Sequence, residues 1–215
     1  NELDLFRPNG LNDYSPGRGL VPIGLSYHLG SFQFLAEYRY SSRYFLYNYW
    51  DRSYEINRAT VAFDTTETGS DEISTKENSL KNYGEMNGVY SQLTGNIANL
   101  LYLSTSYTYM KGEVKNAEID GWETQNNNSF ITVLSLKENL IPRLKKAEAF
   151  YQQKNVPNPF DFEFTETSLY GFVVGFQISQ DMVIQYKSTT SFIMSENGID
   201  YEPISTILVE TQFAF

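Results

Sequence analysis

The chain ends with Ile207-Leu-Val-Glu-Thr-Gln-Phe-Ala-Phe215, a stretch in which the residues alternate in character. Successive side chains of a β-strand point to opposite faces, so every second residue shares a face. One face would carry Ile207, Val209, Thr211, Phe213 and Phe215. The other would carry Leu208, Glu210, Gln212 and Ala214. Because chain termini are usually frayed and polar, an aromatic residue at the very end is unusual for a soluble protein.

This ending resembles the closing strand of bacterial outer-membrane β-barrels, whose last residue is typically an aromatic that the insertion machinery reads. The resemblance covers about nine residues. It implies an all-β, antiparallel, up-and-down transmembrane barrel in the outer membrane of a Gram-negative bacterium, with the C-terminus on the periplasmic side. It also implies two partners, the lipid bilayer and the insertion machinery that would bind the C-terminal strand.

The composition is compatible with this class and excludes several others. The 215 residues include 17 Tyr, 15 Phe and 2 Trp, and such aromatic side chains suit a membrane interface. No apolar run is long enough for a transmembrane helix, which needs about 18 residues. The absence of cysteine excludes disulfides and thiolate metal sites, and the net charge of −10 argues against nucleic acid as a partner. No signal peptide is recognisable, so we expect a removed leader or a longer parent chain.

Hydrophobic residues elsewhere in the chain repeat with a period of two, which predicts strands. The clearest are Leu20–His28, Phe32–Ser42, Leu100–Met110, Ser129–Lys137, Ser168–Ile178, Asp181–Ile193 and Ile204–Phe215. Weaker ones are Ser53–Phe63, Tyr83–Thr94 and Lys146–Gln153, the last of which also has helical propensity. We therefore predict a single domain over residues 1–215 with about ten strands, in which residues 1–19 either lie outside the barrel or add a strand.

The predicted connections alternate between long and short. Counting back from a periplasmic Phe215, the external loops are Met194–Tyr201, Lys154–Thr167, Lys111–Asn126 and Asp64–Asn82. The periplasmic turns are the shorter Ser179–Gln180, Glu138–Lys145 and Gly95–Asn99. Long external loops and short periplasmic turns are typical of transmembrane barrels. The external loops are also rich in acidic residues.

One region breaks this alternation. Counting further back places the tight turn His28–Ser31 outside and the aromatic segment Arg43–Arg52 inside. An extra strand at Tyr44–Trp50 would restore the order and give 11 strands, or 12 if Glu2–Phe6 also pairs. The remaining alternative is that the chain supplies only part of a larger barrel.

Polar residues on the faces opposite the apolar stripes are candidates for the barrel lumen. They are Gln33, Glu37, Arg39, Arg58, Thr60, Gln185, Lys187, Glu210 and Gln212. They either line a channel and set its selectivity or form a salt-bridged core in a narrow plugged barrel. Two aromatic girdles are predicted at the membrane interfaces, from Tyr107, Tyr109 and Tyr170 at the external side and from Phe213 and Phe215 at the periplasmic side.

Catalytic and metal sites are not indicated. His28 is the only histidine, and no serine-hydrolase or zinc-protease motif accompanies it, so it is predicted to be a turn residue. The acid-rich Ser195–Glu202 and Asn116–Glu123 lack calcium-loop spacing and are predicted to be solvated hairpin tips. No cofactor is expected. Phe160, Phe162 and Phe164 are predicted to begin the next strand, with an inward constriction, a docking surface or an apolar ligand site as alternatives.

Four functions remain open at this point. The first is a passive pore or transport protein, or a barrel subunit that assembles with other envelope proteins. The second is a plugged structural or adhesive barrel that acts through its acidic external loops. A soluble ligand-binding barrel is the third. The fourth is a barrel hydrolase, which the isolated His28 disfavours, so an enzyme is not expected.

Overall fold

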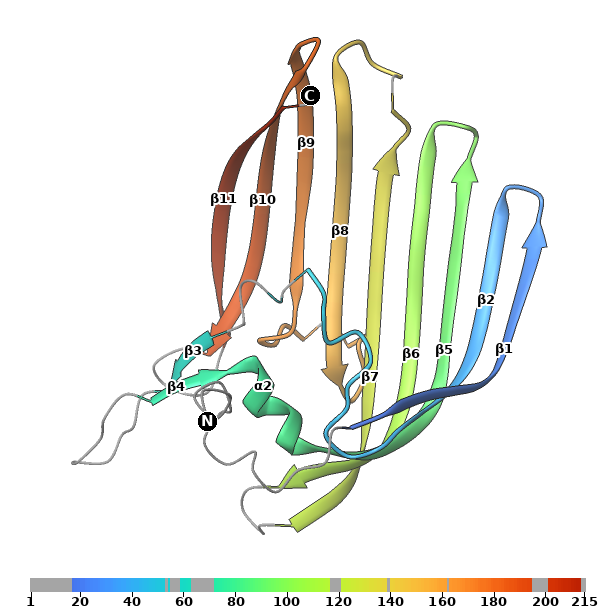
Figure 1. The fold of residues 1–215 in the computed structure, drawn as a ribbon, viewed down its shortest axis with the longest axis vertical. Helices are drawn as coiled ribbons and strands as arrows, with labels where there is room; N and C mark the ends of the chain where they lie inside the picture. Colours follow the sequence, from blue (N-terminus) through green and yellow to red (C-terminus); the bar gives the residue numbers. More distant parts are fainter. Residues whose placement is uncertain are drawn as a thin grey trace, which may run out of the picture. The chain divides into compact units, whose positions relative to one another are not determined.

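Nine long strands form one sheet in the computed structural model, which describes residues 17–52, 54, 59–62, 72–116, 121–138, 140–161, 163–194 and 201–213. The strands are β1 (Gly19–Leu29), β2 (Phe32–Ser41), β5 (Tyr83–Ile97), β6 (Leu101–Asn116), β7 (Gly121–Leu136), β8 (Leu144–Val156), β9 (Leu169–Ser179), β10 (Met182–Met194) and β11 (Tyr201–Phe213). Their order in the sheet follows their order in the chain, and neighbours are antiparallel (Figure 1). The all-β, up-and-down prediction is confirmed, and Leu144–Val156 is a strand rather than a helix.

The segment between β2 and β5 differs from the prediction. Of the predicted strand Ser53–Phe63 the structure describes Tyr54 and Ala59–Ala62; the latter form β3 (Ala59–Ala62), which pairs with β4 (Glu72–Thr75) in a separate two-stranded sheet and not with the large sheet. The short helix α2 (Lys76–Ser79) and the 3-10 turn η2 (Leu80–Asn82) then lead into β5. β3 and β4 pair over only four residues each. So short a strand has no long alternating pattern, which agrees with the poorly sorted faces of the predicted strand.

The extra strand at Tyr44–Trp50 is also wrong. Tyr44 and Asn48 have φ values of 65° and 57°, which are incompatible with an extended chain. Among the described residues the large sheet has nine strands, whereas about ten were predicted and eleven or twelve were the alternatives. The Glu2–Phe6 segment lies outside the described residues.

With these two segments outside the large sheet, the turn His28–Ser31 falls at the same end as the other predicted short turns, but the alternation of lengths fails at β7, which four residues (117–120) precede and seven residues (137–143) follow. The tight turn after β1 now lies at the same end as the turns after β5, β7 and β9 (upper end in Figure 1). Residues 42–82, 117–120, 157–168 and 195–200 connect the strands at their other ends. β11 reaches Phe213 at the end with the tight turns, and β1 and β11 run in the same direction.

β6 and β7 extend well into the predicted loop Lys111–Asn126, of which only residues 117–120 separate the two strands. The sequence predicts a loop here because the hydrophobic alternation of the preceding strand ends at Met110, but Lys111–Asn116 belong to β6. Gly112 permits a close approach to β5, because a Cβ atom there would lie 2.1 Å from the Glu85 carbonyl oxygen. The close backbone contact between β5 and β6 thus allows the strand to continue where its residue pattern did not predict one.

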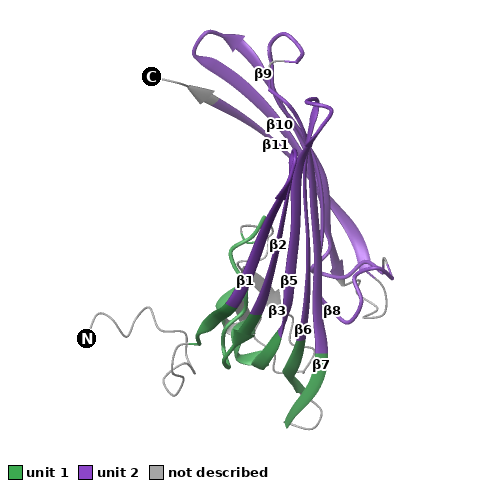
Figure 2. Ribbon diagram, turned by 90° about the vertical axis from the view of Figure 1, so that its right-hand side faces the viewer, with its two compact units in different colours: residues 1–22, 39–87, 111–125 green, residues 23–38, 88–110, 126–215 purple. Residues whose placement is uncertain are grey.

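Contacts divide the chain into two compact units (Figure 2). Unit 1 comprises residues 1–22, 39–87 and 111–125, and unit 2 comprises residues 23–38, 88–110 and 126–215. None of the helices described is long and apolar enough to cross a membrane.

The sheet of unit 2 has two chemically different faces, which are clearest at β8, β9 and β10. The apolar face carries Tyr170, Phe172, Phe176 and Ile178, and Phe172 is 43% and Ile178 51% exposed. The register places Ile184 opposite Phe176 and therefore on the same face. Apolar side chains here are exposed, the reverse of what a soluble protein shows.

The opposite face of the same strands, the polar face, is covered. Gln152, Ser191 and Thr189 are buried there, and so are Leu169, Phe150 and Val173, which form a small apolar cluster with Val133. The register unites them, because Gln152 pairs with Leu169 and Phe150 with Gly171.

Gly171 is required where β8, β9 and β10 pack together. A Cβ atom there would lie 2.1 Å from the Ser188 carbonyl oxygen and 2.9 Å from the Phe150 ring. We expect Gly171→Ala to lower the free energy of unfolding by about 1–3 kcal/mol through overpacking. Urea unfolding of the folded protein in detergent micelles measures this loss. Gly24→Ala, whose Cβ would have its nearest neighbour at 3.6 Å, is the matched control, and equal midpoints for the two variants would contradict the prediction.

Candidate functional site

Three of the predicted lumen residues lie together on the polar face. Gln185 pairs with Glu210 on one side and with Gly175 on the other, and directly paired residues share a face. Lys187 lies one step further along β10, on the same face. The sequence prediction therefore brings these three residues to one surface, as the alternation required.

Two further charged residues complete this group and were missed by the sequence analysis. Lys146 pairs with Gly175, and Glu148 lies two residues further along β8 on the polar face. Lys146 Nζ is 3.9 Å from Glu148 Oε2, and the Ser135 hydroxyl donates to the same oxygen at 3.4 Å. Lys146 and Glu148 were hidden because the stretch around them, Leu144–Phe150, also matches a helix.

Lys146, Glu148 and Gln185 border an open cavity of about 440 Å³. Its other lining residues are Ser135, Leu136, Glu138, Lys145, Ala147 and Val183. Gly175 adds no side chain between Lys146 and Gln185. Cationic, anionic and amide groups thus face one space. Such a surface can contact water or a small polar solute but offers no apolar binding site.

The predicted lumen residues of β2 are Gln33, Glu37 and Arg39. They share one face of the strand because even numbers of positions separate them. Gln33 donates from its amide to the Ser26 hydroxyl at 3.2 Å. Arg39 is buried, and its guanidinium lies 4.8 Å from the ring centroid of Tyr47. Arg58 lies outside the described residues, as do the side chains of Thr60 and Gln212.

A second candidate site is an aromatic pocket in unit 1. It has a volume of about 500 Å³ and is formed mainly by the segment after β2. Its lining residues are Tyr44, Phe45, Leu46, Tyr47, Asn48, Tyr49, Trp50, Glu77 and Leu80. Five of these are aromatic, and the pocket is thus predominantly apolar with two polar side chains, which is the usual composition of a small-molecule site.

Tyr47 anchors the pocket to the strands of unit 1. Its hydroxyl lies 2.7 Å from the Leu20 carbonyl oxygen and 3.0 Å from the Tyr40 carbonyl oxygen. Phe45 packs edge-on against Tyr47 at 5.0 Å between ring centroids. Gly19 leaves the space for this pair, because a Cβ atom there would lie 2.4 Å from the Phe45 ring. The pocket therefore rests on a fixed base.

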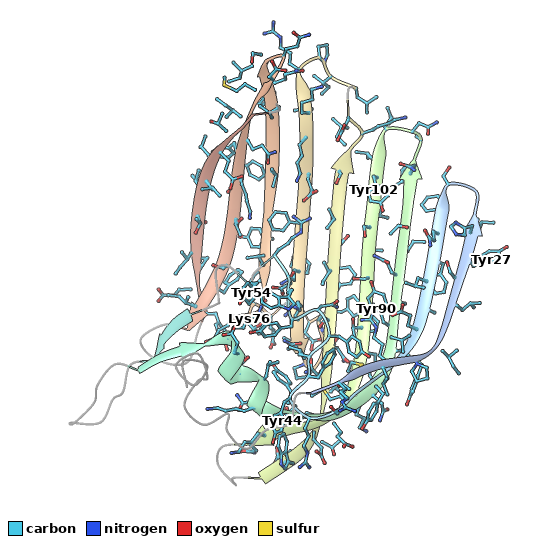
Figure 3. The ribbon with its side chains drawn as sticks, viewed as in Figure 1. Tyr27, Tyr44, Tyr54, Lys76, Tyr90 and Tyr102 are labelled. Carbon is cyan, nitrogen blue, oxygen red and sulfur yellow. The ribbon has the colours of Figure 1, made fainter. Side chains whose placement is uncertain are left out.

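Lys76, on α2, places an ammonium group among the rings next to the pocket. Its Nζ donates to the Tyr49 carbonyl oxygen at 3.0 Å and to Asp51 Oδ1 at 3.2 Å. The same Nζ lies 5.2 Å from the ring centroids of both Tyr49 and Tyr54. Lys76 and Tyr54 are labelled in Figure 3. Aromatic faces attract cations by their quadrupole, so these rings stabilise a largely covered ammonium.

Trp50 forms the exposed rim. It is 73% exposed, and its ring lies 4.2 Å from the ring centroid of Tyr54 and 5.3 Å from that of Tyr49. The Tyr54 hydroxyl donates to Glu77 Oε1 at 3.0 Å. The sequence signal for this site was the high density of aromatic residues in Tyr44–Trp50. The sequence analysis considered these residues only as an extra strand and not as a pocket.

Phe160 and Phe164 do not begin the next strand, which corrects the prediction for these two residues, since β9 starts at Leu169. Phe160 stacks on Tyr107 at 5.4 Å, and Phe164 stacks on Phe192 at 4.3 Å between ring centroids. Phe164 also lies 6.2 Å from Tyr170. These rings extend the aromatic group predicted around Tyr107 and Tyr170.

The remaining predicted residues are placed as follows. Tyr109 is 40% exposed. Phe162, Phe215 and the side chain of Phe213 lie outside the described residues. His28 borders a shallow cavity of about 230 Å³ with Gln33, Asn96 and Tyr102. Within the described part of the chain, no group of three acidic, histidine or cysteine side chains is arranged to hold a metal ion.

Tyr49 makes the aromatic pocket sensitive to alkaline pH. Its burial, and then the nearby Glu77 carboxylate, raise the pKa of Tyr49 above the usual value of 10.0. Unfolded tyrosine ionises near pH 10 while folded Tyr49 stays protonated, so we expect stability to fall as the pH rises above this value. Urea unfolding at increasing pH should show a smaller fall for Tyr49→Phe than for the unmodified protein. Tyr44→Phe controls for loss of a tyrosine, and identical pH profiles for Tyr49→Phe and the unmodified protein would count against the prediction.

Comparisons with known proteins give no relative for this chain. No family model, no curated protein and no solved structure matches it. The two faces of the sheet and the aromatic pocket are therefore the observations from which its function is inferred.

Proposed function

We propose that the chain forms the wall of an outer-membrane β-barrel that admits small polar solutes. The observation that carries the proposal is the inverted burial of the sheet, in which Phe172, Phe176 and Ile178 are exposed while Gln152 and Thr189 are buried. In a lipid environment the exposed apolar face would contact hydrocarbon and the polar face would point into the barrel. Barrel strands alternate in this way.

The arrangement of connections supports the orientation. The two- or three-residue turns after β1, β5 and β9 and the residue Phe213 lie at one end of the strands, and the two longest connections, residues 42–82 and 157–168, lie at the other. In transmembrane barrels the short turns are periplasmic and the long loops external. Phe160, Phe164 and Tyr170 supply aromatic rings of the kind found at a membrane interface.

Closure of the sheet requires strands beyond the nine. β1 and β11 stand at the two ends of the sheet order and run in the same direction. An antiparallel barrel needs an even number of strands, so one further strand, or another odd number, would pair with both edges. A barrel is needed at all because hydrocarbon cannot satisfy the backbone groups of an open edge.

A plugged barrel is the second candidate, and a specific observation favours it. Phe150, Leu169 and Val173 form an apolar cluster on the polar face, and all three are buried. In a narrow barrel such a cluster would fill the interior. The charged residues Lys146, Glu148 and Lys187 would then form a structural polar core rather than the lining of a channel.

The membrane proposal is tested by a charge on the apolar face. Phe172→Arg should lower the free energy of unfolding from lipid vesicles by about 2–4 kcal/mol if the side chain lies near the bilayer midplane. Gln185→Arg, on the polar face of the neighbouring strand, should have a much smaller effect. A soluble protein would tolerate arginine at an exposed position, so equal stabilities of the two variants would refute a lipid-facing Phe172.

The channel proposal is tested by ion selectivity in planar bilayers. Lys187→Glu replaces a cation on the polar face by an anion and should shift the reversal potential towards cation preference. Ser188→Ala alters the neighbouring residue, which faces the other side of β10, and should leave the reversal potential unchanged. Absence of any conductance in the unmodified protein would remove the channel and leave the plugged barrel.

A further inference from the structure

The connection between β8 and β9, residues 157–168, folds over the apolar face of the sheet. The Phe164 ring stacks on Phe192 at 4.3 Å between ring centroids and lies 6.2 Å from Tyr170. Tyr170 belongs to the apolar face, and Phe192 lies two residues beyond Thr190, the partner of Tyr170 in β10. Both rings beneath Phe164 are therefore on this face, and the connection turns away from the polar face.

Phe160 makes a second contact with the same face. Its ring lies 5.3 Å from that of Phe130 between ring centroids. Phe130 pairs with Gln153, and Gln153 lies two residues beyond Tyr151. Tyr151 in turn pairs with Tyr170, so all of these side chains share the apolar face. Two phenylalanines of one connection thus rest on rings of the sheet.

Hydrogen bonds hold the connection on the sheet. The Gln153 side chain donates from Nε2 to the Glu163 carbonyl oxygen at 2.6 Å. Asn128 donates from Nδ2 to the Pro157 carbonyl oxygen at 2.6 Å, and the Thr167 hydroxyl donates to a backbone oxygen of β8. Gln153 is only 1% exposed, so the connection covers a polar side chain on the apolar face. Residues 157–168 are therefore fixed at their beginning, middle and end.

The outward side of the two phenylalanines is open. Phe160 is 48% and Phe164 43% exposed, whereas Phe192 beneath is only 6% exposed. Polar groups next to the rings are bonded within the connection, because Asn158 donates from Nδ2 to Asp161 Oδ1 at 2.6 Å. The Phe160 backbone N–H donates to Asn158 Oδ1 at 3.2 Å. Exposed rings beside internally bonded polar groups suit the border between hydrocarbon and lipid headgroups.

The length of the apolar stripe on β9 places these rings at one of its borders. The stripe runs from Tyr170 to Ile178, a rise of about 27 Å at roughly 3.4 Å per residue. A strand tilted by about 40° covers about 21 Å of this along the membrane normal, close to the apolar band of about 25 Å in transmembrane barrels. With Ile178 at the periplasmic border, Tyr170 and the neighbouring Phe164 ring lie at the external border.

We infer that residues 157–168 form an aromatic clasp on the outer surface of the barrel, which anchors it at the bilayer interface through the rings of Phe160 and Phe164. The inference rests on the proposed membrane location and adds a partner for this connection. That partner is the glycerol and headgroup layer of the lipid. Ring surface rather than charge recognises it, because residues 157–168 include three acidic residues and neither Lys nor Arg.

Two other roles for the clasp fit less well. A connection folded inward would constrict the lumen, but Phe160 and Phe164 contact the opposite face of the sheet. A protein partner could also cover exposed rings. The clasp, however, adjoins the exposed stripe of Phe172 and Phe176, so the medium that contacts that stripe would contact the clasp as well.

Quenching of tryptophan fluorescence by brominated lipids measures the depth of the clasp. Trp50→Phe and Trp122→Phe together remove both native tryptophans, and Phe164→Trp is added to this background. The protein is folded into phosphatidylcholine vesicles whose acyl chains carry bromine either near the headgroup or near the chain ends. We expect the tryptophan of the Phe164→Trp variant to lose more fluorescence to the bromines near the headgroup.

Two further variants in the same background accompany this measurement. Tyr186→Trp is the matched control, because Tyr186 pairs with Val174 at the middle of the apolar stripe and is 36% exposed. Its tryptophan should lose more fluorescence to the bromines near the chain ends. Phe160→Trp probes the other ring of the clasp and should behave as Phe164→Trp does.

Two results would overturn the clasp and leave the lipid-facing sheet intact. One is stronger quenching of Phe164→Trp and Phe160→Trp by the bromines near the chain ends. The other is no quenching of either variant while Tyr186→Trp is quenched, which would assign the rings to water or to a protein partner. Absence of quenching in Tyr186→Trp would instead refute the lipid-facing sheet and the clasp with it. If Phe164→Trp does not fold, Phe160→Trp decides alone, because Phe160 contacts a different part of the sheet.

Discussion

The two-residue period of the strands is the constraint on which the rest of the structure depends. It sorts the side chains of β8, β9 and β10 onto two faces, so that Phe172 and Phe176 are exposed on one while Gln152 and Leu169 are buried on the other. A shift of one residue in any strand would exchange these faces. The register is therefore what keeps Gln185, Lys187 and Glu210 on one surface, and the polar face exists only because every neighbouring strand keeps the same phase.

The long segment between β2 and β5 obeys different rules. Its positive φ values at Tyr44 and Asn48 break the extended chain, and its aromatic rings pack on one another instead of lying on a sheet face. Hydrogen bonds from Tyr47 and Lys76 to backbone oxygens fix the segment in place. The strands are regular, and the aromatic pocket is formed mainly by the irregular segment that follows β2.

Sequence patterns predict what strand periodicity controls. They predicted the nine main strands, and they brought Gln185, Lys187 and Glu210 to one face, because the alternation of polar and apolar residues is read directly from the chain. They failed at Ala59–Ala62, which pairs with β4 instead of joining the large sheet, and the alternative strand at Tyr44–Trp50 is excluded by its backbone conformation. They also failed at Lys111–Asn116, which was predicted as part of a loop but belongs to β6, where Gly112 approaches β5 closely. The ring contacts of Lys76 bring together segments that no local pattern connects.

The shared direction of β1 and β11 has a consequence for self-association. Two copies standing side by side with the same orientation would bring β11 of one molecule next to β1 of the other, and these strands would be parallel. The antiparallel hydrogen-bond ladder used throughout the sheet could not continue across such a junction. A sheet with an odd number of strands therefore disfavours edge-to-edge association of identical copies. A strand that runs in the opposite direction could pair with either edge in the antiparallel manner.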